Sequence, residues 1–389
     1  MRHDGLALRL GARLEAPLKD DCDVAVIGGS LAGSAAACAL ARTGARVIVL
    51  EKARFPRDKV CGCFLSDEAL PVLHRMRLGE ELGRNEAETI THFRLVRRDG
   101  IAVESLLPKP AMSISRGRLD FFAAKAAERA GARMRFSTTV LSLEGDLQEG
   151  FRIKGLDWEL GARAVVGAWG RYSPLDGRLG RTFIRRKPSL FGFGKMLAGS
   201  REHLAGRAVL HFFEGGYVGL SRVEGGLVNL AALAAPRVAQ SAHHDFDSLL
   251  HRLCGESPAL AADLEGLTPV PGPPLISEPV YLGRHGAVAG DVLCVGDAAG
   301  VIDPYTGTGM SLALLFGEAV AAPLAGFLAK ALDADELRRA HLRRHREIAG
   351  RRFFLSRLFR PFFSGGVASR LVSPAAAPIA RWAARATRE

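Results

Sequence analysis

The segment Val26-Ile27-Gly28-Gly29-Ser30-Leu31-Ala32-Gly33 constrains the fold more than any other part of the chain. An apolar run, 24–27, precedes it and a run of small residues, 34–41, follows it, so a buried strand, a tight turn and a helix ending near Gly44 are expected. A second apolar run, 47–50, ends at an acid. The order of these elements predicts a β-α-β unit that binds a dinucleotide.

Each position of this unit has an expected role. Gly28 permits the tight turn, Gly33 lets helix and strand pack closely, and the helix start directs N–H groups and partial positive charge at a pyrophosphate. Ser30 stands where the fingerprint prefers glycine, so the backbone approaches the phosphates less closely. Glu51 has the spacing of an acid that contacts a ribose hydroxyl. We therefore predict cofactor contacts from Gly28, Ser30, Leu31, Ala32, Gly33, Glu51 and Lys52.

A second glycine-rich segment, Gly296-Asp297-Ala298-Ala299-Gly300, follows the short apolar run 292–295. Asp303-Pro304 and Gly307-Thr308-Gly309-Met310 come next, before a long apolar helix from about Ser311. A carboxylate at a strand end can accept hydrogen bonds from ribityl hydroxyls, and a glycine-rich helix start can direct N–H groups at a ring carbonyl. Nicotinamide cofactors have no ribityl chain, so the predicted cofactor is FAD.

Together these segments resemble the FAD-dependent oxidoreductases of the p-hydroxybenzoate hydroxylase and geranylgeranyl reductase superfamily, over roughly residues 22 to 330. The resemblance implies an α/β fold: a Rossmann-type, glutathione-reductase-like FAD-binding domain, an inserted antiparallel β-sheet substrate domain and a helical C-terminal tail. It also implies that Asp297 holds the ribityl chain and that Pro304 lies near the isoalloxazine. Gly307, Thr308, Gly309 and Met310 would lie beside the pyrimidine edge of the flavin.

Two further segments fit the same resemblance, and one departs from it. Arg57-Asp58-Lys59-Val60-Cys61-Gly62 resembles the loop along the flavin, which implies that Lys59, Cys61 and Gly62 contact FAD. Arg116, with Leu119-Asp120, resembles an arginine motif that helps to hold FAD. In Gly167-Ala168-Trp169-Gly170, however, tryptophan replaces the aspartate that is usual in the hydroxylases. Trp169 offers no carboxylate, so the way in which NAD(P)H reduces the flavin stays open.

Short apolar runs between the FAD segments predict the substrate domain, since they alternate with glycine and charged turns. They are 191–197, 208–213, 217–223 and 227–233, with Glu224-Gly225-Gly226 as the clearest turn and 89–106 as an addition. The expected domains are 22–88, 110–175 and 280–335 for FAD, 89–109 and 176–279 for substrate, and a helical basic region 336–389. Two expectations remain for Phe191, Phe193, Phe212, Phe213 and Tyr217: they line an apolar pocket, or they are plain core.

The residues around Tyr217 discriminate among reactions. Geranylgeranyl reductases usually follow this tyrosine with tryptophan and phenylalanine-proline, whereas this chain has Gly219-Leu220-Ser221, and the tryptophan-rich segment of flavin-dependent halogenases is missing. We expect first an NAD(P)H-driven monooxygenase acting on an aromatic or lipid-like intermediate. The alternative is reduction of a prenyl or quinone C=C bond, and a third reading is a non-catalytic lipid-binding protein such as the Rab GDP-dissociation inhibitors. Cys61, Pro304 and Tyr217 are the candidate catalytic residues.

Metal and disulfide chemistry are not expected. The six cysteines accompany no export signal, because the first twenty residues lack a continuous apolar core, so we expect reduced thiols in a cytoplasmic protein. Cys61-Gly62-Cys63 has no second Cys/His pair at the spacing of a zinc site. His341 and His345 are four residues apart among arginines, and we expect them on a solvated basic helix face.

The net charge of +12 suggests partners, but no nucleic-acid-binding module accompanies it. The segment 351–360 mixes arginine, phenylalanine and leucine as an interfacial helix does, which would allow peripheral membrane contact. The same basic surface would also suit an acidic carrier protein or a phosphate of NADPH. The apolar run 310–329 is long enough for a membrane span, but Glu318 interrupts it, so we expect a core helix.

Overall fold

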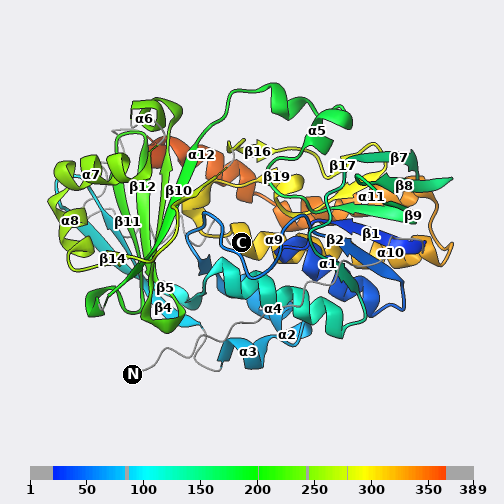
Figure 1. Ribbon diagram of the computed structural model, residues 1–389, viewed down its shortest axis with the longest axis horizontal. Coiled ribbons are helices and arrows are strands. Elements are labelled where there is room, and N and C mark those ends of the chain that lie inside the picture. The colour runs from blue at the N-terminus through cyan, green and yellow to red at the C-terminus, as the bar shows by residue number, and fades with distance from the viewer. Residues whose placement is uncertain (1–20, 84–86, 200, 242–244, 278, 365–389) are drawn as a thin grey trace.

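The computed structural model describes residues 21–83, 87–199, 201–241, 245–277 and 279–364, and two β-sheets organise it (Figure 1). The first sheet has the strand order β17-β18-β9-β1-β2-β6, in which β1, β2, β6, β9 and β18 run parallel. Its strands are β1 Cys22–Ile27, β2 Val47–Leu50, β6 Arg133–Arg135, β7 Ser142–Asp146, β8 Gly150–Lys154, β9 Glu159–Gly167, β17 Val288–Ala289 and β18 Val292–Cys294.

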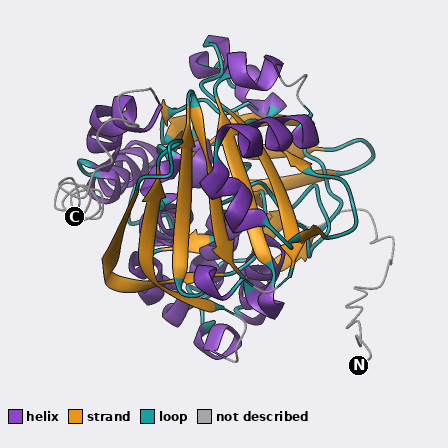
Figure 2. Ribbon diagram, turned by 90° about the vertical axis from the view of Figure 1, so that its left-hand side faces the viewer, coloured by secondary structure: helices purple, strands orange, loops and turns teal. Residues whose placement is uncertain are grey.

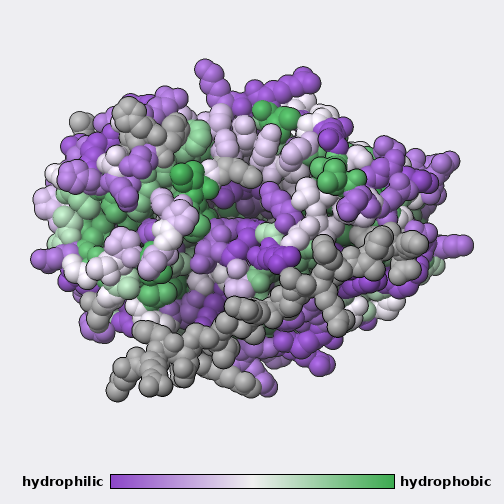
Figure 3. All heavy atoms as spheres, viewed as in Figure 1, coloured by the Kyte–Doolittle hydropathy of each residue, from purple (hydrophilic) through white to green (hydrophobic). Residues whose placement is uncertain are grey.

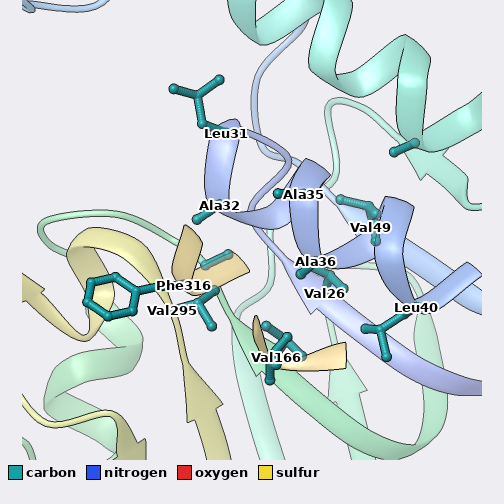
Figure 4. Close-up of a cluster of buried hydrophobic side chains, with 14 of the residues drawn as sticks. Val26, Leu31, Ala32, Ala35, Ala36, Leu40, Val49, Val166, Val295 and Phe316 are labelled. Atoms are coloured by element: carbon teal, nitrogen blue, oxygen red, sulfur yellow. The ribbon is translucent and has the colours of Figure 1, made fainter. Parts of the chain in front are cut away.

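Helices cover this sheet, and its central strands are apolar because both of their faces are buried. The helices are α1 Leu31–Ala41, α4 Arg116–Arg129, α9 Gly309–Ala319, α10 Ala321–Leu328 and α11 Ala334–Ala349. Val24, Ala25 and Val26 of β1 have no exposed surface. Figure 4 shows Val26 and Ala36 in the same cluster as Val166 and Val295, so strands from distant parts of the sequence share one core. The predicted β-α-β unit is confirmed.

The second sheet has the order β14-β10-β13-β12-β11-β4-β5-β3, and Figure 2 looks onto its outer face. Its strands are β3 Phe64–Leu65, β4 Glu88–Val96, β5 Ala102–Ser113, β10 Phe191–Ala198, β11 Arg207–Phe213, β12 Gly216–Arg222, β13 Val228–Ala234, β14 Thr268–Pro269 and β15 Leu275–Ile276. The predicted strands are present, but β11 and β4 run parallel. Hairpin turns set direction only for strands that follow each other in sequence, and β4 and β11 do not.

Side chains of this sheet alternate between two faces, which corrects the expected aromatic cluster. Phe193 is fully buried on the outer face under α6 Pro236–Ser241, α7 Phe246–Glu256 and α8 Pro258–Leu264, and Phe191 and Phe213 pack against the same cluster. Phe212 and Tyr217 belong to a separate cluster, with ring centroids 6.2 Å apart. Phe212 and Tyr217 therefore do not share a face with the other three rings.

The helical run 309–328 lies in the core. Among the described residues it is the one helix that has the length and apolar composition to cross a membrane, and half of it is buried. It consists of α9 and α10, which meet at Val320, and α9 packs closely against α1. This burial agrees with the expected core helix.

The two histidines of α11 are buried, so the expectation of a solvated basic face is wrong for them. His341 Nε2 lies 3.0 Å from the Ala287 carbonyl oxygen and 3.2 Å from that of Cys294. The His345 ring stacks on Phe316 with centroids 4.3 Å apart. The i, i+4 spacing does place both histidines on one face of the helix, but it is the face that packs on the core, and the arginines take the other face.

Short elements complete the fold. They are α2 Leu70–Arg75, α3 Gly79–Gly83, α5 Pro174–Arg178, α12 Arg352–Ser364, β16 Gly283–Arg284 and β19 Gly300–Val301. β3 lies in the FAD-binding part of the sequence but pairs with β5 of the second sheet, and β5 extends to Ser113. The chain segment that leads into β3 therefore lies between the two sheets.

Candidate cofactor and substrate site

The turn between β1 and α1 admits only glycine at two positions. Gly28 has φ +104°, and a Cβ there would lie 2.3 Å from the Ala168 carbonyl oxygen. A Cβ on Gly33 would lie 1.8 Å from the Gly28 carbonyl oxygen. Both distances are far inside van der Waals contact, so the expected roles of Gly28 and Gly33 in the turn and in helix packing are present.

The N-terminus of α1 is open toward the site. Ser30 is its N-cap, but the hydroxyl makes no capping bond; it donates instead to Asp120 Oδ2 at 2.6 Å. Arg116 Nη2 donates to the same hydroxyl at 2.8 Å and Lys59 Nζ at 3.2 Å. Two cations thus lie beside uncapped helix N–H groups at Leu31 and Ala32, an arrangement that favours a diphosphate.

Burial and charge act in opposite directions in this cluster. Burial favours a neutral Asp120, but the charges of Arg116 and Lys59 and the hydrogen bonds to the carboxylate hold its pKa below the usual range. Burial lowers the pKa of Lys59 to about 8, and the charge of Asp120 opposes that shift. A bound diphosphate would add negative charge beside Lys59 and so favour its charged form.

Glu51 lies at the carboxyl end of β2, and its side chain is almost fully buried. It accepts hydrogen bonds from the Gly29 N–H at 2.7 Å and the Ala53 N–H at 2.9 Å. These bonds fix the carboxylate beside the glycine turn, where a ribose would lie. Lys52 is exposed next to it. The contacts of Glu51 and Lys52 with a ribose stay predictions.

The second glycine-rich segment packs directly against the first. Gly296 has φ +59°, and a Cβ there would lie 2.7 Å from the Ala32 Cβ. Gly307, at φ +68°, would place a Cβ 2.8 Å from the Phe64 ring. Thr308 is the N-cap of α9 and makes no side-chain capping bond. A second uncapped helix start, at Gly309 and Met310, therefore faces the same site.

Asp297 is half-buried, and within the described part of the chain no group donates a hydrogen bond to its carboxylate. It is thus a free acceptor between the two helix starts. FAD has a diphosphate in its middle, ribityl hydroxyls beyond it and a ring carbonyl at its end. The open starts of α1 and α9, the paired cations and the free carboxylate fit those three parts of the cofactor.

Three hydrogen bonds to its carbonyl groups hold the loop Cys61-Gly62-Cys63, two of them from side chains of the second sheet. Asn229 Nδ2 donates to the Cys61 oxygen at 2.9 Å and Ser221 Oγ to the Gly62 oxygen at 3.1 Å. The N–H of Ile114, just beyond β5, donates to the Cys63 oxygen at 3.2 Å. Asn229 and Ser221 were not among the predicted site residues. The signal for Asn229 was a single polar residue in an otherwise apolar strand.

The three candidate catalytic residues come from three different segments. A hydrogen bond from Cys63, opposed by burial and helped by the charge of Arg116, lowers the pKa of the Cys61 thiol to about 6. Burial raises the pKa of Tyr217 on β12, and the charge of Cys61 adds to that rise. Pro304 begins the short turn 304–306. Cys61 and Tyr217 are close enough to influence each other electrostatically.

The turn that carries Pro304 is anchored by α12. Asp303 is buried and forms a bidentate ion pair with Arg360, with distances of 2.7 and 3.1 Å. The Tyr305 hydroxyl donates to the Ser356 carbonyl oxygen. The C-terminal helix therefore positions the turn expected to lie beside the isoalloxazine, which the sequence analysis did not anticipate.

Trp169 has a structural partner in place of the missing carboxylate. Its indole Nε1 donates to Asp176 Oδ1 at 3.1 Å, and Asp176 forms a buried ion pair with Arg181 at 2.8 Å. Arg181 in turn donates to the Ala298 carbonyl oxygen at 2.7 Å. This chain of contacts links Trp169 to the segment that carries Asp297.

Glycines in the second sheet let the segment before the Cys61 loop pack closely against it. A Cβ on Gly192 would lie 3.0 Å from Val60 Cγ1, and one on Gly194 would lie 3.7 Å from Val60 Cα. The glycines therefore set how closely this segment approaches the sheet. The space-filling view is hollowed between the second sheet and the FAD-binding part (Figure 3).

The fold and the site define an α/β enzyme that binds FAD. The family model described as "FAD binding domain" matches residues 21–214. Menaquinone reductase of Mycobacterium tuberculosis is 31% identical over 324 residues, covering 78% of this chain and 76% of that protein. The menaquinone reductase of Mycolicibacterium smegmatis is 29% identical over 319 residues, covering 77% and 75%.

Solved structures share the fold at lower identity. Flavin-dependent brominase Bmp2 matches with a TM-score of 0.78 at 17% identity, covering 95% of both chains. A probable FAD-dependent monooxygenase from Pseudomonas aeruginosa, pqsL, matches with a TM-score of 0.68 at 19% identity, covering 95% and 99%. The chain belongs to the FAD-dependent oxidoreductases of the p-hydroxybenzoate hydroxylase-like superfamily. The predicted family and fold class are confirmed.

Proposed function

We propose that this oxidoreductase reduces a C=C bond of a prenylated quinone or a related polyprenyl lipid. The observation that carries the proposal is the likeness to menaquinone reductases over about three quarters of both chains. Hydroxylation, which the sequence placed first, becomes the alternative, because likeness to monooxygenases at under one fifth identity bears on the fold alone.

Reduction of a C=C bond adds a hydride to one carbon and a proton to the other. FAD in its reduced state supplies the hydride when it is bound. The chain supplies the proton and the orientation. A tyrosine hydroxyl carries its proton at neutral pH, since its ordinary pKa is about 10. Tyr217 lies on the face that carries Ser221 and Asn229, which bind the Cys61 loop. We assign proton donation to Tyr217 and stabilisation of the reacting geometry to Cys61 and Pro304.

A large, apolar substrate would lie in the hollow between the second sheet and the FAD-binding part (Figure 3). Phe212 and Tyr217 would bound the hollow with aromatic surface. An isoprenoid chain is apolar and gains about 25 cal/mol for each Å² that it removes from water, so it needs few specific polar contacts.

The reductant is a separate part of the proposal. NAD(P)H would dock transiently, since the described residues form no second dinucleotide-binding unit. Trp169, which is tied to Asp176, leaves no free carboxylate in that segment to receive it. Comparing flavin bleaching by NADH, by NADPH and by dithionite under anaerobic conditions would identify the donor.

The testing experiment incubates the FAD-loaded protein with menaquinone under argon, with dithionite as the electron source. After the extracted lipid is reoxidised in air, so that any quinol formed directly by dithionite returns to the quinone, a product that still carries two added hydrogens in the mass spectrum is the expected result. Tyr217→Phe should lower its yield at unchanged FAD content. Product that gains one oxygen, formed only in air, would replace the proposal by hydroxylation. A colourless protein that takes up no FAD would favour the non-catalytic lipid-binding reading.

A lipid substrate also gives α12 a role. Phe354 and Leu358 of this helix are 68% and 54% exposed, and Arg351 and Arg357 are exposed on the same side. An apolar and basic helix face of this kind suits the interface of an anionic membrane. Because Asp303 and Tyr305 contact α12, a membrane-bound α12 would bring the lipid surface close to the Pro304 turn. The region 365–389, part of the predicted basic tail, lies outside the described residues.

A further inference from the structure

Cys63 has a backbone conformation that its side chain disfavours. Its φ is +55°, in the left-handed region that glycine adopts without steric strain and that is unfavourable for most other residues. The chain therefore has a cysteine where the backbone favours glycine.

The left-handed turn brings the two cysteines of the loop together. The Cys63 N–H donates to Cys61 Sγ at 3.4 Å, so the second cysteine of the loop folds back onto the sulfur of the first. Cys61 is partly exposed toward the site, whereas Cys63 is fully buried behind it. One sulfur is thus accessible and the other is in reach of it, which is the arrangement of an attacking and a resolving cysteine.

The surroundings hold this arrangement in place. The carbonyl groups of Cys61 and Gly62 accept from side chains of the second sheet, and that of Cys63 accepts from the Ile114 N–H just beyond β5, so the loop cannot turn its thiols away without breaking those bonds. The Arg116 guanidinium lies beside Cys61 and favours its thiolate form, while the buried Cys63 keeps its proton. A thiolate next to a thiol is the protonation state from which thiol oxidation proceeds.

We propose that Cys61 and Cys63 are a redox-active dithiol that exchanges two electrons with the bound FAD. In the oxidising direction a bond forms between the two Sγ atoms and the Cys63 S–H bond breaks. Two electrons pass to oxidised FAD, and one proton leaves the thiol for solvent. In the opposite direction the S–S bond breaks, Cys63 takes up one proton and Cys61 becomes a thiolate, with two electrons that a reduced flavin would supply.

This exchange gives the site a second store of electrons and does not depend on the substrate. A dithiol reductant from solution would reach the flavin through Cys61, in addition to any NAD(P)H. After each turnover the reduced Cys61–Cys63 dithiol would also be available to reduce the flavin again. The proposal concerns residues 61 and 63 alone, so failure of menaquinone reduction would leave it intact.

The test is an anaerobic dithionite titration of the air-oxidised, FAD-loaded protein, followed by the flavin absorbance. The wild-type protein is expected to take up four electrons per flavin before full bleaching, and the Cys63→Gly variant only two. Cys63→Gly suits the left-handed backbone, so it removes the thiol without disturbing the turn. Cys254→Ser removes a partly buried thiol on α7 and should still take up four electrons.

A thiol count provides a readout independent of the flavin. The chain has six cysteines, so the reduced, denatured protein should show six free thiols and the air-oxidised protein four, with the peptide that contains residues 61–63 lighter by two hydrogens. Uptake of two electrons by the wild-type protein, or six free thiols after oxidation, would overturn the proposal. Were Cys63→Gly to lose FAD, Cys61→Ser would test the same expectation.

Discussion

Gly317 of α9 lies against the backbone of Ala32 in α1, so closely that a Cβ on Gly317 would stand 2.1 Å from the Ala32 carbonyl oxygen. Both helices begin at the cofactor site. Their contact therefore sets the distance between the diphosphate end and the ring end of the site, and a single hydrogen in place of a methyl group keeps that distance short.

Gly317→Ala should separate the two helices, because the clash involves a backbone atom that cannot rotate away. We expect a loss of about 1–3 kcal/mol in unfolding free energy and weaker FAD retention. Urea unfolding and the flavin content after gel filtration measure the two effects. The matched control is Gly255→Ala in α7, where a Cβ meets nothing within 4 Å. Equal behaviour of the two variants would contradict the close packing.

Asp297→Ala removes the free acceptor next to the open start of α9. Hydrogen bonds to a charged group contribute about 1.5–3 kcal/mol, so FAD affinity should fall about 10- to 100-fold while the protein remains folded. Fluorescence titration of the apoprotein with FAD measures the change. Asp297→Asn keeps one acceptor oxygen, so its FAD affinity should lie between those of the wild-type protein and the alanine variant. Unchanged affinity in the alanine variant would mean that the ribityl chain is held elsewhere.

His345 should make stability depend on pH. Burial lowers its pKa in the folded protein from 6.5 to about 4, so folding favours the neutral ring. The resulting stability is fully present above pH 6.5 and is lost as the pH falls through about 4. The loss approaches about 3 kcal/mol, at about 1.4 kcal/mol for each pH unit between the two pKa values.

The measurement compares urea midpoints at pH 7 and pH 4.5 in the wild-type protein and in His345→Phe, which retains a ring against Phe316. The variant should lose less stability between the two pH values than the wild-type protein does. Asp263, whose pKa is held low against burial by its bond to His211, contributes equally in both proteins and cancels from the difference. Identical pH dependence would show that His345 protonates freely in the fold.

The exposed face of α12 predicts binding to anionic vesicles. Replacing both Phe354 and Leu358 with glutamine should lower the partition coefficient onto phosphatidylglycerol-rich vesicles, measured by cosedimentation, by about 100-fold or more, because each apolar side chain contributes about 1.5–3 kcal/mol when buried. The control is Leu156→Gln, since Leu156 is 90% exposed on a turn far from α12 in sequence. Equal binding of both variants and the wild-type protein would remove α12 as the contact.

Local patterns predicted the parts of the fold that local chemistry determines. The glycine turn, the second glycine segment and the alternating strands of the substrate sheet all have short-range causes, and each was found where expected. The parallel pairing of β11 with β4 was not predictable in this way, since no turn connects those strands. The burial of His341 and His345 depends on which face of α11 meets the core, and that is decided by elements elsewhere in the chain.

The residues of the site differ in the same way in whether the sequence could predict them. Residues with a conformational or charge signature of their own, such as Gly28 and Asp297, could be identified from the sequence. Arg360 could not, because its role arises from contact with Asp303 across 57 positions. Asn229 carried a weak signal, as the single polar residue of an apolar strand, whose meaning depended on the loop that it binds. Ser221 carried no such signal, because Arg222 follows it in the same strand.

The hydrogen bonds between the second sheet and the Cys61 loop have a consequence for separating the protein into fragments. The loop belongs by chain order to the part that binds FAD, yet side chains of β12 and β13 in the other part bind two of its three carbonyl groups. An excised FAD-binding fragment would thus lack the wall that shapes its own flavin loop. Anything that strains strands β12 and β13, including a bound guest, will alter the flavin's surroundings, so the colour of the protein itself should report occupancy of the hollow.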